Sequence, residues 1–335
     1  MKLNKILKDI RYKGNPDSRE IINITHDSRK VKDGTLFIAI SGENNDGHDF
    51  IFDAIKKGAV AIIANGRAPV TNLVPIIQVD NPRKTMSKIA DNFFEQPSSK
   101  LNIIGITGTN GKTTTTQIID HILKTNNFTS SSLGTLGFNS PSGIISTGFT
   151  TPESIDLHQI LKMIKDGGIE YVPMEISSHA IEMNRIDDVK VDIGIFTNIG
   201  LDHLDFHKTQ ENYFNSKLKL FKNLSKNNLA ILNNDDKYCN RIIENINCKY
   251  LTYGFSENSD LRIKNYTLNI NYSKAKVKYQ NKLYDFETNL IGKYNLSNLM
   301  AAMLCCIQVG IPLNNIIKSI KNINNESGRL EKFTL

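Results

Sequence analysis

The sequence has few cysteines, and they do not form a metal-binding pattern. Its four cysteines are Cys239, Cys248, Cys305 and Cys306, and no two of them have C-x-x-C spacing. Cys305 and Cys306 stand in an apolar stretch with helical spacing, where cysteine usually acts as a small core residue. The pattern therefore predicts buried cysteines rather than a cysteine-ligated metal.

Targeting and membrane-spanning segments are also missing. Residues 1–14 carry charges throughout and lack the apolar core of a signal peptide. The nearest candidate for a membrane span, residues 299–307, is too short to cross a bilayer. We therefore expect a cytoplasmic protein without membrane insertion.

The chain has a positive net charge but no nucleic-acid-binding pattern. Lys and Arg number 41 against 34 Asp and Glu, a net charge of +7, but no basic run is interleaved with aromatic residues. A Lys-rich composition explains this balance, and a modest positive charge also suits an anionic substrate. At 335 residues, with 39% hydrophobic and 22% charged residues, the chain has the balance of a globular protein of two or three domains.

Residues 101–116, LNIIGITGTNGKTTTT, are the most informative stretch. An apolar β-branched run precedes a glycine turn, and apolar residues at helical spacing follow. Such a strand, turn and helix cradle phosphates: Lys112 reaches the β- and γ-phosphates and Thr113 can hold Mg²⁺. The predicted nucleotide-binding residues are Gly108, Thr109, Asn110, Gly111, Lys112, Thr113 and Thr114.

A plain glycine turn is the alternative reading of this stretch. The usual pattern G-x-x-x-x-G-K-[ST] is not met in full, because Ile106 occupies its first glycine position. The strand before the turn and the helix after it favour the nucleotide-binding interpretation.

Strand and helix patterns alternate along the whole chain and predict an α/β fold. Residues 1–97 are expected to form a small α/β unit with strands at 36–40, 59–64 and 76–79 and helices at 50–57 and from Pro82. Residues 26–29 and 46–49 have the composition of turns. Residues 98–327 predict an open, largely parallel sheet. Its further strands are expected at 171–175, 191–197, 229–232 and 249–253, with a hairpin-like excursion at 261–290 and a helix at 292–309.

Polar clusters follow several of these strands, where ligands bind in parallel sheets. Glu175 is a candidate Mg²⁺ ligand with Thr113, because Mg²⁺ takes oxygen ligands; a salt-bridged Glu is the alternative. His203 reads equally well as a metal ligand or as a loop histidine. Lys217 alone reads as a solvated lysine on an amphipathic helix.

Together these residues resemble the Mur ligases, and most closely the MurE type, which adds the third amino acid of the peptidoglycan stem. The resemblance runs through nearly the whole sequence and is carried by motifs in a fixed order. They are residues 27–29 (DSR), 34–39 (GTLFIA), 46–48 (DGH), 107–113 (TGTNGKT), 150–153 (TTPE), 174–180 (MEISSHA), Asn198 with 202–205 (DHLD), the Lys217 segment, 292–298 (GKYNLSN) and 328–331 (GRLE).

The resemblance implies a role for each of several residues. Lys217 is similar to the family lysine that becomes carbamylated and then ligates Mg²⁺, together with Thr113, Glu175 and His203. Lys112, Glu175, His203 and Lys217 are the implied catalytic residues. Asn295 and Asn298 are expected to contact ATP, and Ser28 the uridine end of the substrate. Thr150, Thr151, Ser177 and Arg185 are expected to hold its phosphate and sugar-peptide portion.

The implied reaction uses ATP and Mg²⁺ to activate the carboxylate of UDP-N-acetylmuramoyl-L-Ala-D-Glu as an acyl-phosphate. The amino group of an amino acid then attacks, releasing phosphate. The sequence leaves open whether that amino acid is lysine, diaminopimelate or another. The implied organisation is a UDP-substrate-binding domain at 1–97, a central ATP-binding domain at 98–327 and, at 328–335, the start of a linker to an amino-acid-binding domain. We expect a monomer.

Because the sequence ends at Leu335, we expect it to bind nucleotide, Mg²⁺ and UDP-substrate without completing ligation alone. In the diaminopimelate-adding members of the family, a DNPR motif in the amino-acid-binding domain selects the amino acid. Residues 80–83 have the same letters but lie in the predicted N-terminal domain, so we interpret them as structural. Two other readings stay open: another amide ligase of the superfamily (the MurF type or a folylpolyglutamate synthase), and a non-catalytic nucleotide-binding remnant.

Overall fold

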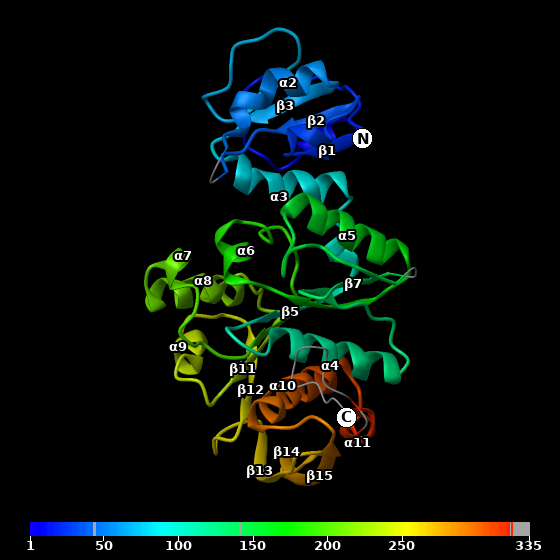
Figure 1. Cartoon of the computed structure of the whole chain (residues 1–335), viewed down its shortest axis with the longest axis vertical. Coiled ribbons are helices and arrows are strands. Elements are labelled where there is room, and N and C mark those ends of the chain that lie inside the picture. Colours follow the sequence, from blue (N-terminus) through cyan, green and yellow to red (C-terminus); the bar gives the residue numbers. More distant parts are fainter. Residues whose placement is uncertain (43–44, 141–142, 322, 324–335) are drawn as a thin grey trace. The chain divides into compact units, whose positions relative to one another are not determined.

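The computed structural model describes residues 1–42, 45–140, 143–321 and 323. They form two compact units (Figure 1). The first comprises residues 1–100, 152–163 and 182–189, and the second comprises residues 101–151, 164–181 and 190 onward. The predicted linker at 328–335, with the GRLE motif, lies outside the described residues.

The first unit is built on a parallel sheet in which the strands pair in sequence order. These strands are β1 (Asn23–Thr25), β2 (Thr35–Ile38), β3 (Ala59–Ala64) and β4 (Ile76–Gln78). Helices α1 (Leu3–Ile6) and α3 (Pro82–Phe93) share a core with Leu36 and Ile38 of β2. Helix α2 (Ile51–Lys56) packs with Phe37 on the opposite face of the sheet. The alternation along β2 therefore gives each face its own core.

Short 3₁₀ turns connect the elements of this unit. Two of them, η1 (Ser28–Lys30) and η2 (Gly47–Phe50), lie where the sequence predicts turn chemistry, and η3 (Pro97–Lys100) follows α3. The carboxylates of Asp27 and Asp46 accept from backbone N–H groups at the starts of η1 and η2. Asn81 caps α3 and Pro82 opens it, which confirms the structural interpretation of residues 80–83.

The second unit contains a long, mostly parallel sheet. Its pairing order is β15-β14-β13-β12-β11-β10-β5-β9-β6-β7-β8 among the described residues, and its antiparallel pairs lie at the two ends. The strands are β5 (Asn102–Thr107), β6 (Leu133–Gly134), β7 (Gly137–Ser140), β8 (Gly143–Ile145), β9 (Tyr171–Glu175), β10 (Ile193–Phe196), β11 (Leu229–Asn233), β12 (Lys249–Gly254), β13 (Leu261–Leu268), β14 (Ser273–Tyr279) and β15 (Lys282–Thr288).

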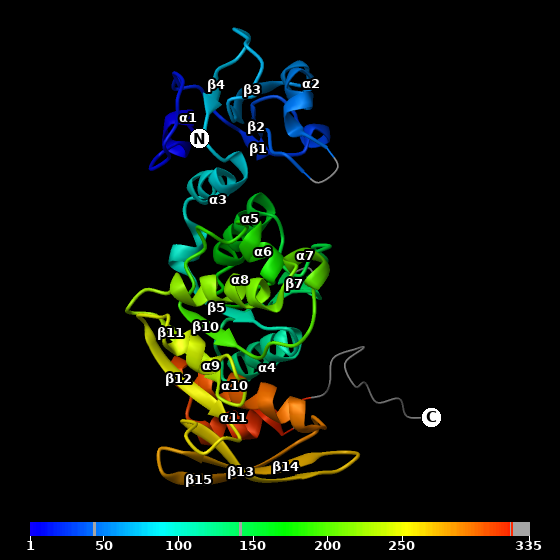
Figure 2. The same cartoon turned by 90° about the vertical axis from the view of Figure 1, so that its left-hand side faces the viewer.

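Helices pack on both faces of this sheet. Helices α4 (Lys112–Thr125), α10 (Lys293–Val309) and α11 (Leu313–Ile320) bury apolar residues against one face. Helix α8 (Gln210–Lys222) places Phe221 against Gly194 and Phe196 of β10. The remaining helices are α5 (Ser154–Asp166), which extends into the first unit, α6 (Ser178–Glu182), α7 (Leu204–His207) and α9 (Cys239–Ile243). Figure 2 shows the chain turned by 90°.

This architecture confirms the predicted α/β fold class. Strands β3 and β9 have the expected bounds, and the hairpin-like excursion is a three-stranded antiparallel meander, β13–β15. Cys305 and Cys306 are fully buried in α10, as predicted. None of the helices in the described part of the chain is long and apolar enough to span a membrane.

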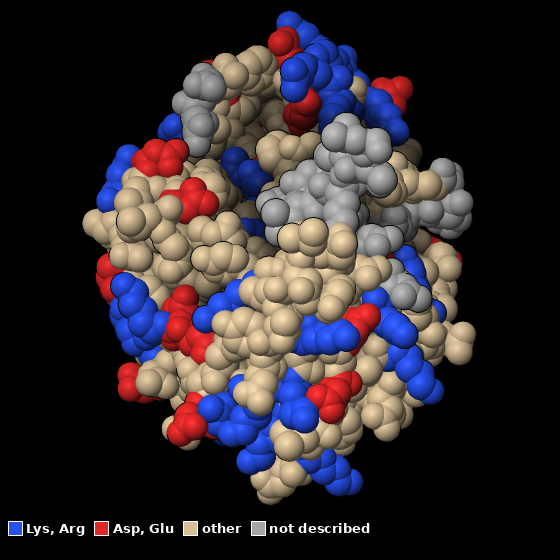
Figure 3. Space-filling model, turned by 60° about the horizontal axis from the view of Figure 1, so that its bottom comes forward, with Lys and Arg blue, Asp and Glu red and all other residues tan. Residues whose placement is uncertain are grey.

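Charged residues of both signs are interspersed on the face over β13–β15 (Figure 3). Lys274 pairs with Glu287 at 3.0 Å and Lys276 with Asp285 at 3.5 Å, across β14 and β15. Exposed pairs of this kind contribute little to stability. Lys274 and Lys276 therefore each face an acidic partner on β15.

A buried histidine in the first unit makes its stability depend on pH. His158 of α5 is fully buried, and neither ring nitrogen has a hydrogen-bond partner among the described residues. Asp91 Oδ1 lies 3.7 Å from Nδ1, too far for a hydrogen bond. Burial, aided by the charge of Lys88, lowers the pKa of His158 from 6.5 to about 3. The ring therefore stays neutral in the folded protein.

We expect acid to destabilise the protein through His158. Below pH 6.5 the unfolded chain binds a proton that the folded ring does not bind until about pH 3, so unfolding becomes easier as the pH falls through that interval. The loss is on the order of 1 kcal/mol per pH unit below about pH 6. Urea unfolding of the wild type and His158→Leu between pH 4 and 8 measures it.

The leucine variant should show a shallower pH dependence. Some slope will remain, because burial also lowers the pKa of His26. Equal slopes in the two proteins would contradict this role of His158.

Candidate active site

The phosphate-loop residues 108–111 join the central strand β5 to helix α4, as the sequence predicts. Gly111 has a positive φ of 84°, which side-chain-bearing residues rarely adopt. A Cβ atom there would overlap with Oδ1 of Asn298, and a Cβ on Gly108 would overlap with Oγ1 of Thr197. Neighbouring side chains therefore close on the loop backbone at both glycines.

Residues that follow β10 hold this loop in place. The backbone N–H of Asn110 donates to Asn198 Oδ1 at 3.0 Å, and Asn198 Nδ2 donates back to the Asn110 carbonyl at 3.0 Å. Thr197 Oγ1 donates to the same carbonyl at 2.7 Å. The loop is thus fixed by the neighbouring parallel strand, at the carboxyl edge where ligands bind in such sheets.

Two lysines converge on one carbonyl oxygen of the loop. Lys112 Nζ donates to the carbonyl oxygens of Gly108 and Thr109 at 2.8 and 2.9 Å, and Lys217 Nζ donates to that of Gly108 at 3.0 Å. Lys217 is only 2% exposed. Considered alone in the sequence, Lys217 was interpreted as a solvated lysine; that interpretation is wrong, because α8 turns this residue toward the loop.

Burial holds the pKa of Lys217 well below its ordinary value, and the positive charge of Lys112 lowers it further. The carboxylate of Asp202 acts in the opposite direction. The lowered pKa means that Lys217 has a larger neutral, nucleophilic fraction than a surface lysine.

The carboxylate of Glu175, at the end of β9, lies against the start of α4. It is 1% exposed, and Thr113 Oγ1 donates to its Oε2 at 3.0 Å. The backbone N–H of Thr135 donates to Oε1 at 2.8 Å and its hydroxyl to Oε2 at 3.2 Å. The structure therefore pairs the two oxygen-bearing residues that the sequence proposed as Mg²⁺ ligands.

Three of the predicted substrate-binding residues are hydrogen-bonded around Glu175, to its main chain, to the partner of its carboxylate or to one another. Thr150 Oγ1 lies 3.1 Å from Thr135 Oγ1. Thr151 Oγ1 donates to the Glu175 carbonyl at 2.9 Å and accepts from the backbone N–H of Ser177 at 3.1 Å. These residues form one polar network with Glu175.

His203 stands at the start of α7 with a positive φ of 53° and is 44% exposed at its side chain. Its ring meets His179 edge-on at 4.8 Å between centroids, and its Nε2 lies 3.6 Å from Asp202 Oδ2. Among the described residues, no three His, Cys, Asp or Glu side chains are grouped closely enough to hold a metal ion. Among these residues, His203 and Glu175 are therefore not members of a preformed cluster of three such side chains.

The remaining predicted ATP residues lie at the starts of two helices. Thr114 is in the first turn of α4. Asn298 lies against Gly111, and Asn295 donates to the Ile291 carbonyl at 2.9 Å in the first turn of α10. Both asparagines are 8% exposed. The structure thus brings Asn298 to the phosphate loop.

Tyr213 was missed in the sequence analysis. It is 1% exposed; its hydroxyl lies 3.0 Å from Thr109 Oγ1, and its ring faces Lys217 Nζ at 4.4 Å. The spacing of four residues between Tyr213 and Lys217 was the available signal, because residues i and i+4 share one helix face.

The other two predicted substrate-binding residues, Ser28 and Arg185, lie in the first unit and contact different residues. The Ser28 carbonyl accepts from Lys57 Nζ at 3.1 Å. Arg185 Nη2 lies 2.7 Å from Glu153 Oε1, and Arg83 Nη1 lies 3.3 Å from Glu153 Oε2. Arg185 and Glu153 are 13% and 14% exposed at their side chains, so this is a largely desolvated cluster of two cations and one carboxylate.

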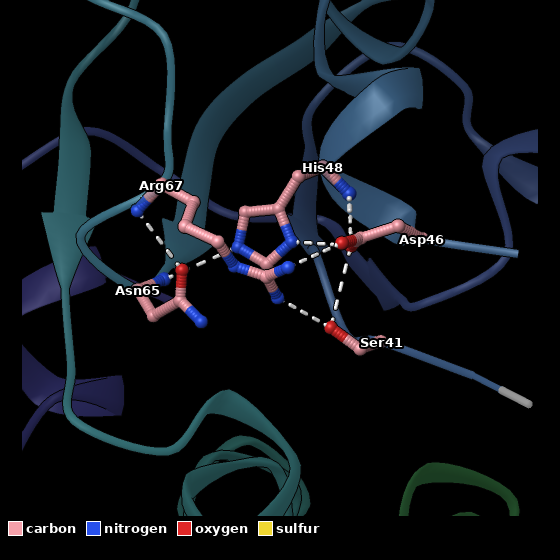
Figure 4. A network of polar contacts seen from close by, with 5 residues as sticks. All are labelled: Ser41, Asp46, His48, Asn65 and Arg67. Carbon is pink, nitrogen blue, oxygen red and sulfur yellow. Dashed lines mark hydrogen bonds and ion pairs between the residues drawn. The ribbon is translucent and has the colours of Figure 1, made fainter.

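The DGH motif belongs to a polar clasp, defined here as Ser41, Asp46, His48, Asn65 and Arg67 (Figure 4). The Asp46 carboxylate accepts from His48 Nδ1 at 2.6 Å and from Arg67 Nη1 at 2.7 Å, and Arg67 Nη2 donates to Ser41 Oγ at 2.6 Å. These bonds, led by the His48 side chain, lower the pKa of Asp46 to about 2. The clasp ties the segment after β2 to the segment after β3.

The fold and the loop define a nucleotide-binding α/β protein with a phosphate loop. Sequence profiles identify the family: residues 106–306 match the Mur ligase middle domain, and residues 20–94 match the Mur ligase family, catalytic domain. The chain belongs to the Mur ligase family.

Two curated relatives are named UDP-N-acetylmuramoyl-L-alanyl-D-glutamate–2,6-diaminopimelate ligase. That of Clostridium tetani is 38% identical, covering 100% of this chain and 70% of the relative. That of Aquifex aeolicus is 39% identical, covering 95% and 66%.

Solved structures of Mur ligases are also similar to this chain. The structure of a UDP-N-acetylmuramoyl-L-alanyl-D-glutamate–2,6-diaminopimelate ligase is similar to this chain with a TM-score of 0.82 at 25% identity, covering 96% of this chain and 66% of its own. A MurF ligase from Thermotoga maritima in complex with ADP has the same fold, with a TM-score of 0.66 at 22% identity, over 92% of this chain and 67% of its own. The chain thus spans about two thirds of the length of the proteins it matches.

We expect Gly111→Ala to impair ATP binding far more than Gly168→Ala. Both glycines have positive φ, 84° and 76°, so each alanine should cost about 1 kcal/mol of unfolding free energy. Only at Gly111 would the new Cβ also overlap with Asn298. Calorimetric titration with ATP should show a loss of affinity of about tenfold or more for Gly111→Ala, equivalent to 1.4 kcal/mol.

Gly168→Ala is the matched control, because nothing lies within 4 Å of its added Cβ. Equal ATP affinities for the two variants would contradict the role given to the contact between Gly111 and Asn298.

Proposed function

We propose that this chain carries the nucleotide and substrate sites of an ATP-dependent ligase that adds the third amino acid to UDP-N-acetylmuramoyl-L-Ala-D-Glu in peptidoglycan synthesis. The observation that carries the proposal is the convergence of Lys112, Lys217 and the Thr113–Glu175 pair on one phosphate loop. Relatives named for this reaction, at 38% and 39% identity, support the substrate class.

Lys112 and the start of α4 would stabilise the charge on a transferring phosphoryl group. Backbone N–H groups at the start of a helix and a lysine at the loop favour the negative charge of the triphosphate. Phosphoryl transfer needs positioning and charge stabilisation more than covalent chemistry. The substrate carboxylate would receive the γ-phosphoryl group, and an amino group would then displace phosphate from the acyl-phosphate.

The oxygen-rich pair of Thr113 and Glu175 fits Mg²⁺, which takes hard oxygen ligands. We propose that these two residues hold the ion on the phosphate side, where it would supply further neutralisation of charge. His203 and a carbamylated Lys217 would contribute to a second site. Carbamylation joins neutral Lys217 Nζ to CO₂ with loss of one proton, and the lowered pKa of this amine favours the reactive form.

Substrate contacts are proposed in both units. Ser28 would meet the uridine end of the substrate. Thr150, Thr151, Ser177 and Arg185 would meet its phosphate and sugar-peptide portion, and the first three already share a polar network with Glu175. The proposed domains remain 1–97 for the UDP-substrate and 98–327 for ATP, in a monomeric protein.

We expect calorimetry to show saturable binding of UDP-N-acetylmuramoyl-L-Ala-D-Glu to the wild type. Arg185→Ala should weaken it about tenfold or more, because a charge-assisted hydrogen bond is lost, and Ser28→Ala by a smaller factor. ATP affinity should be unchanged in both variants. Arg241→Ala, which removes an exposed Arg–Glu pair at 2.6 Å in the second unit, is the control and should bind both ligands normally.

A folded wild type that binds ATP but not this UDP-dipeptide would overturn the substrate assignment and favour a nucleotide-binding protein of another kind. Thermal denaturation of each variant checks that binding losses are not losses of folding.

A further inference from the structure

One hydroxyl group joins three elements around the phosphate loop. Thr109 Oγ1, in the loop, accepts from the backbone N–H of Gly200 at 2.9 Å and lies 3.0 Å from the Tyr213 hydroxyl. Gly200 belongs to the segment after β10 that leads to Asp202 and His203, and Tyr213 belongs to α8. The Thr109 hydroxyl therefore links the loop to both neighbours.

The ring of Tyr213 faces a second group of the same site. Lys217 Nζ lies 4.4 Å from the ring centroid, within the range of a cation–π contact, and donates to the Gly108 carbonyl. The ring also packs near His203 and His207, at 6.0 and 5.0 Å between centroids. One buried side chain thus contacts the phosphate loop through its hydroxyl and Lys217 through its face.

Tyr213 is well suited to fix these groups, because its own position is rigid. It is 1% exposed and lies on a helix whose next residue, Phe214, stacks on Tyr238 at 4.6 Å. Phe221 of the same helix packs on β10. A rigid aromatic side chain on a packed helix places its hydroxyl more accurately than a loop residue could.

We propose that Tyr213 is a positioning residue that sets the phosphate loop and Lys217 relative to each other, through its bond to Thr109 and its ring contact with Lys217. This inference rests on the proposed function, since it concerns the ATP site of the same reaction. It assigns Tyr213 no contact with the reacting atoms.

The two partners of the hydroxyl pair should respond differently to mutation. In Tyr213→Phe, the Thr109 hydroxyl keeps its bond from Gly200, so stability should change little while the loop loses a restraint. In Thr109→Val, the buried Tyr213 hydroxyl and the Gly200 N–H both lose their partner, so the melting temperature should fall as well. Thr109→Ser retains the hydroxyl and should restore both properties.

The test measures ATP affinity by calorimetry, with Tyr238→Phe as the matched control. Tyr238 is also a buried tyrosine and packs on α8, but against Phe214 rather than the loop. We expect Tyr213→Phe to weaken ATP binding about fivefold to tenfold, as for the loss of one hydrogen bond, and Tyr238→Phe to bind like the wild type.

A second readout separates positioning from simple stability. The Lys217 signal in NMR spectra of protein with ¹³C-labelled lysine should keep its wild-type chemical shift in Tyr213→Phe, which keeps the ring. The signal should shift in Tyr213→Leu, which removes the ring. A purely structural role would lower the melting temperature without this pattern.

Equal ATP affinity in Tyr213→Phe and Tyr238→Phe, or an unaltered Lys217 signal in Tyr213→Leu, would overturn the inference while leaving the proposed function standing. A wild type that does not bind ATP would overturn the proposed function itself, and the inference with it.

Discussion

The Gly108 carbonyl oxygen accepts hydrogen bonds from two lysines, and the electrostatics of the site follow from that arrangement. Lys217 is buried, and Lys112 donates to the same oxygen. Two cations at such short range repel each other strongly where water is excluded. The repulsion is relieved if Lys217 is neutral or if an anion binds nearby. A nucleoside triphosphate bound at the phosphate loop would be such an anion.

The phosphate loop was predictable because its signal is local. Strand, glycine turn, lysine and helix follow one another within residues 101–116, and the parallel sheet places them at its carboxyl edge. The positive φ of Gly111 is also a local feature, because it depends on the conformation of a single residue. The side chain that closes on Gly111, Asn298, comes from α10, and the resemblance to a family indicated this asparagine only as an ATP contact.

Contacts between distant segments were not predictable from residue patterns. The environment of Lys217 depends on how α8 packs on β10, so its amphipathic pattern could not show whether the lysine faces water or the loop. The composition of residues 46–49 predicts a turn, which is correct for the backbone of η2. The ion pair of Asp46 with Arg67 joins residues 21 apart in sequence, and the turn pattern carries no information about it.

Glu175 shows how the fold prepares an oxygen site before any cation binds. Its Oε1 accepts from the backbone N–H of Thr135, in the turn between β6 and β7, whereas Oε2 accepts from the hydroxyls of Thr113 and Thr135. Hydroxyl groups can turn from donor to acceptor, and a backbone N–H cannot. A cation at Oε2 would need the hydroxyls of Thr113 and Thr135 to rotate away from that oxygen, and the Thr113 hydroxyl could then offer a lone pair, while the backbone N–H at Oε1 keeps the carboxylate in place. The side chain at position 113 must therefore be a hydroxyl, since an apolar residue of the same shape would leave both the carboxylate and an incoming cation without a partner.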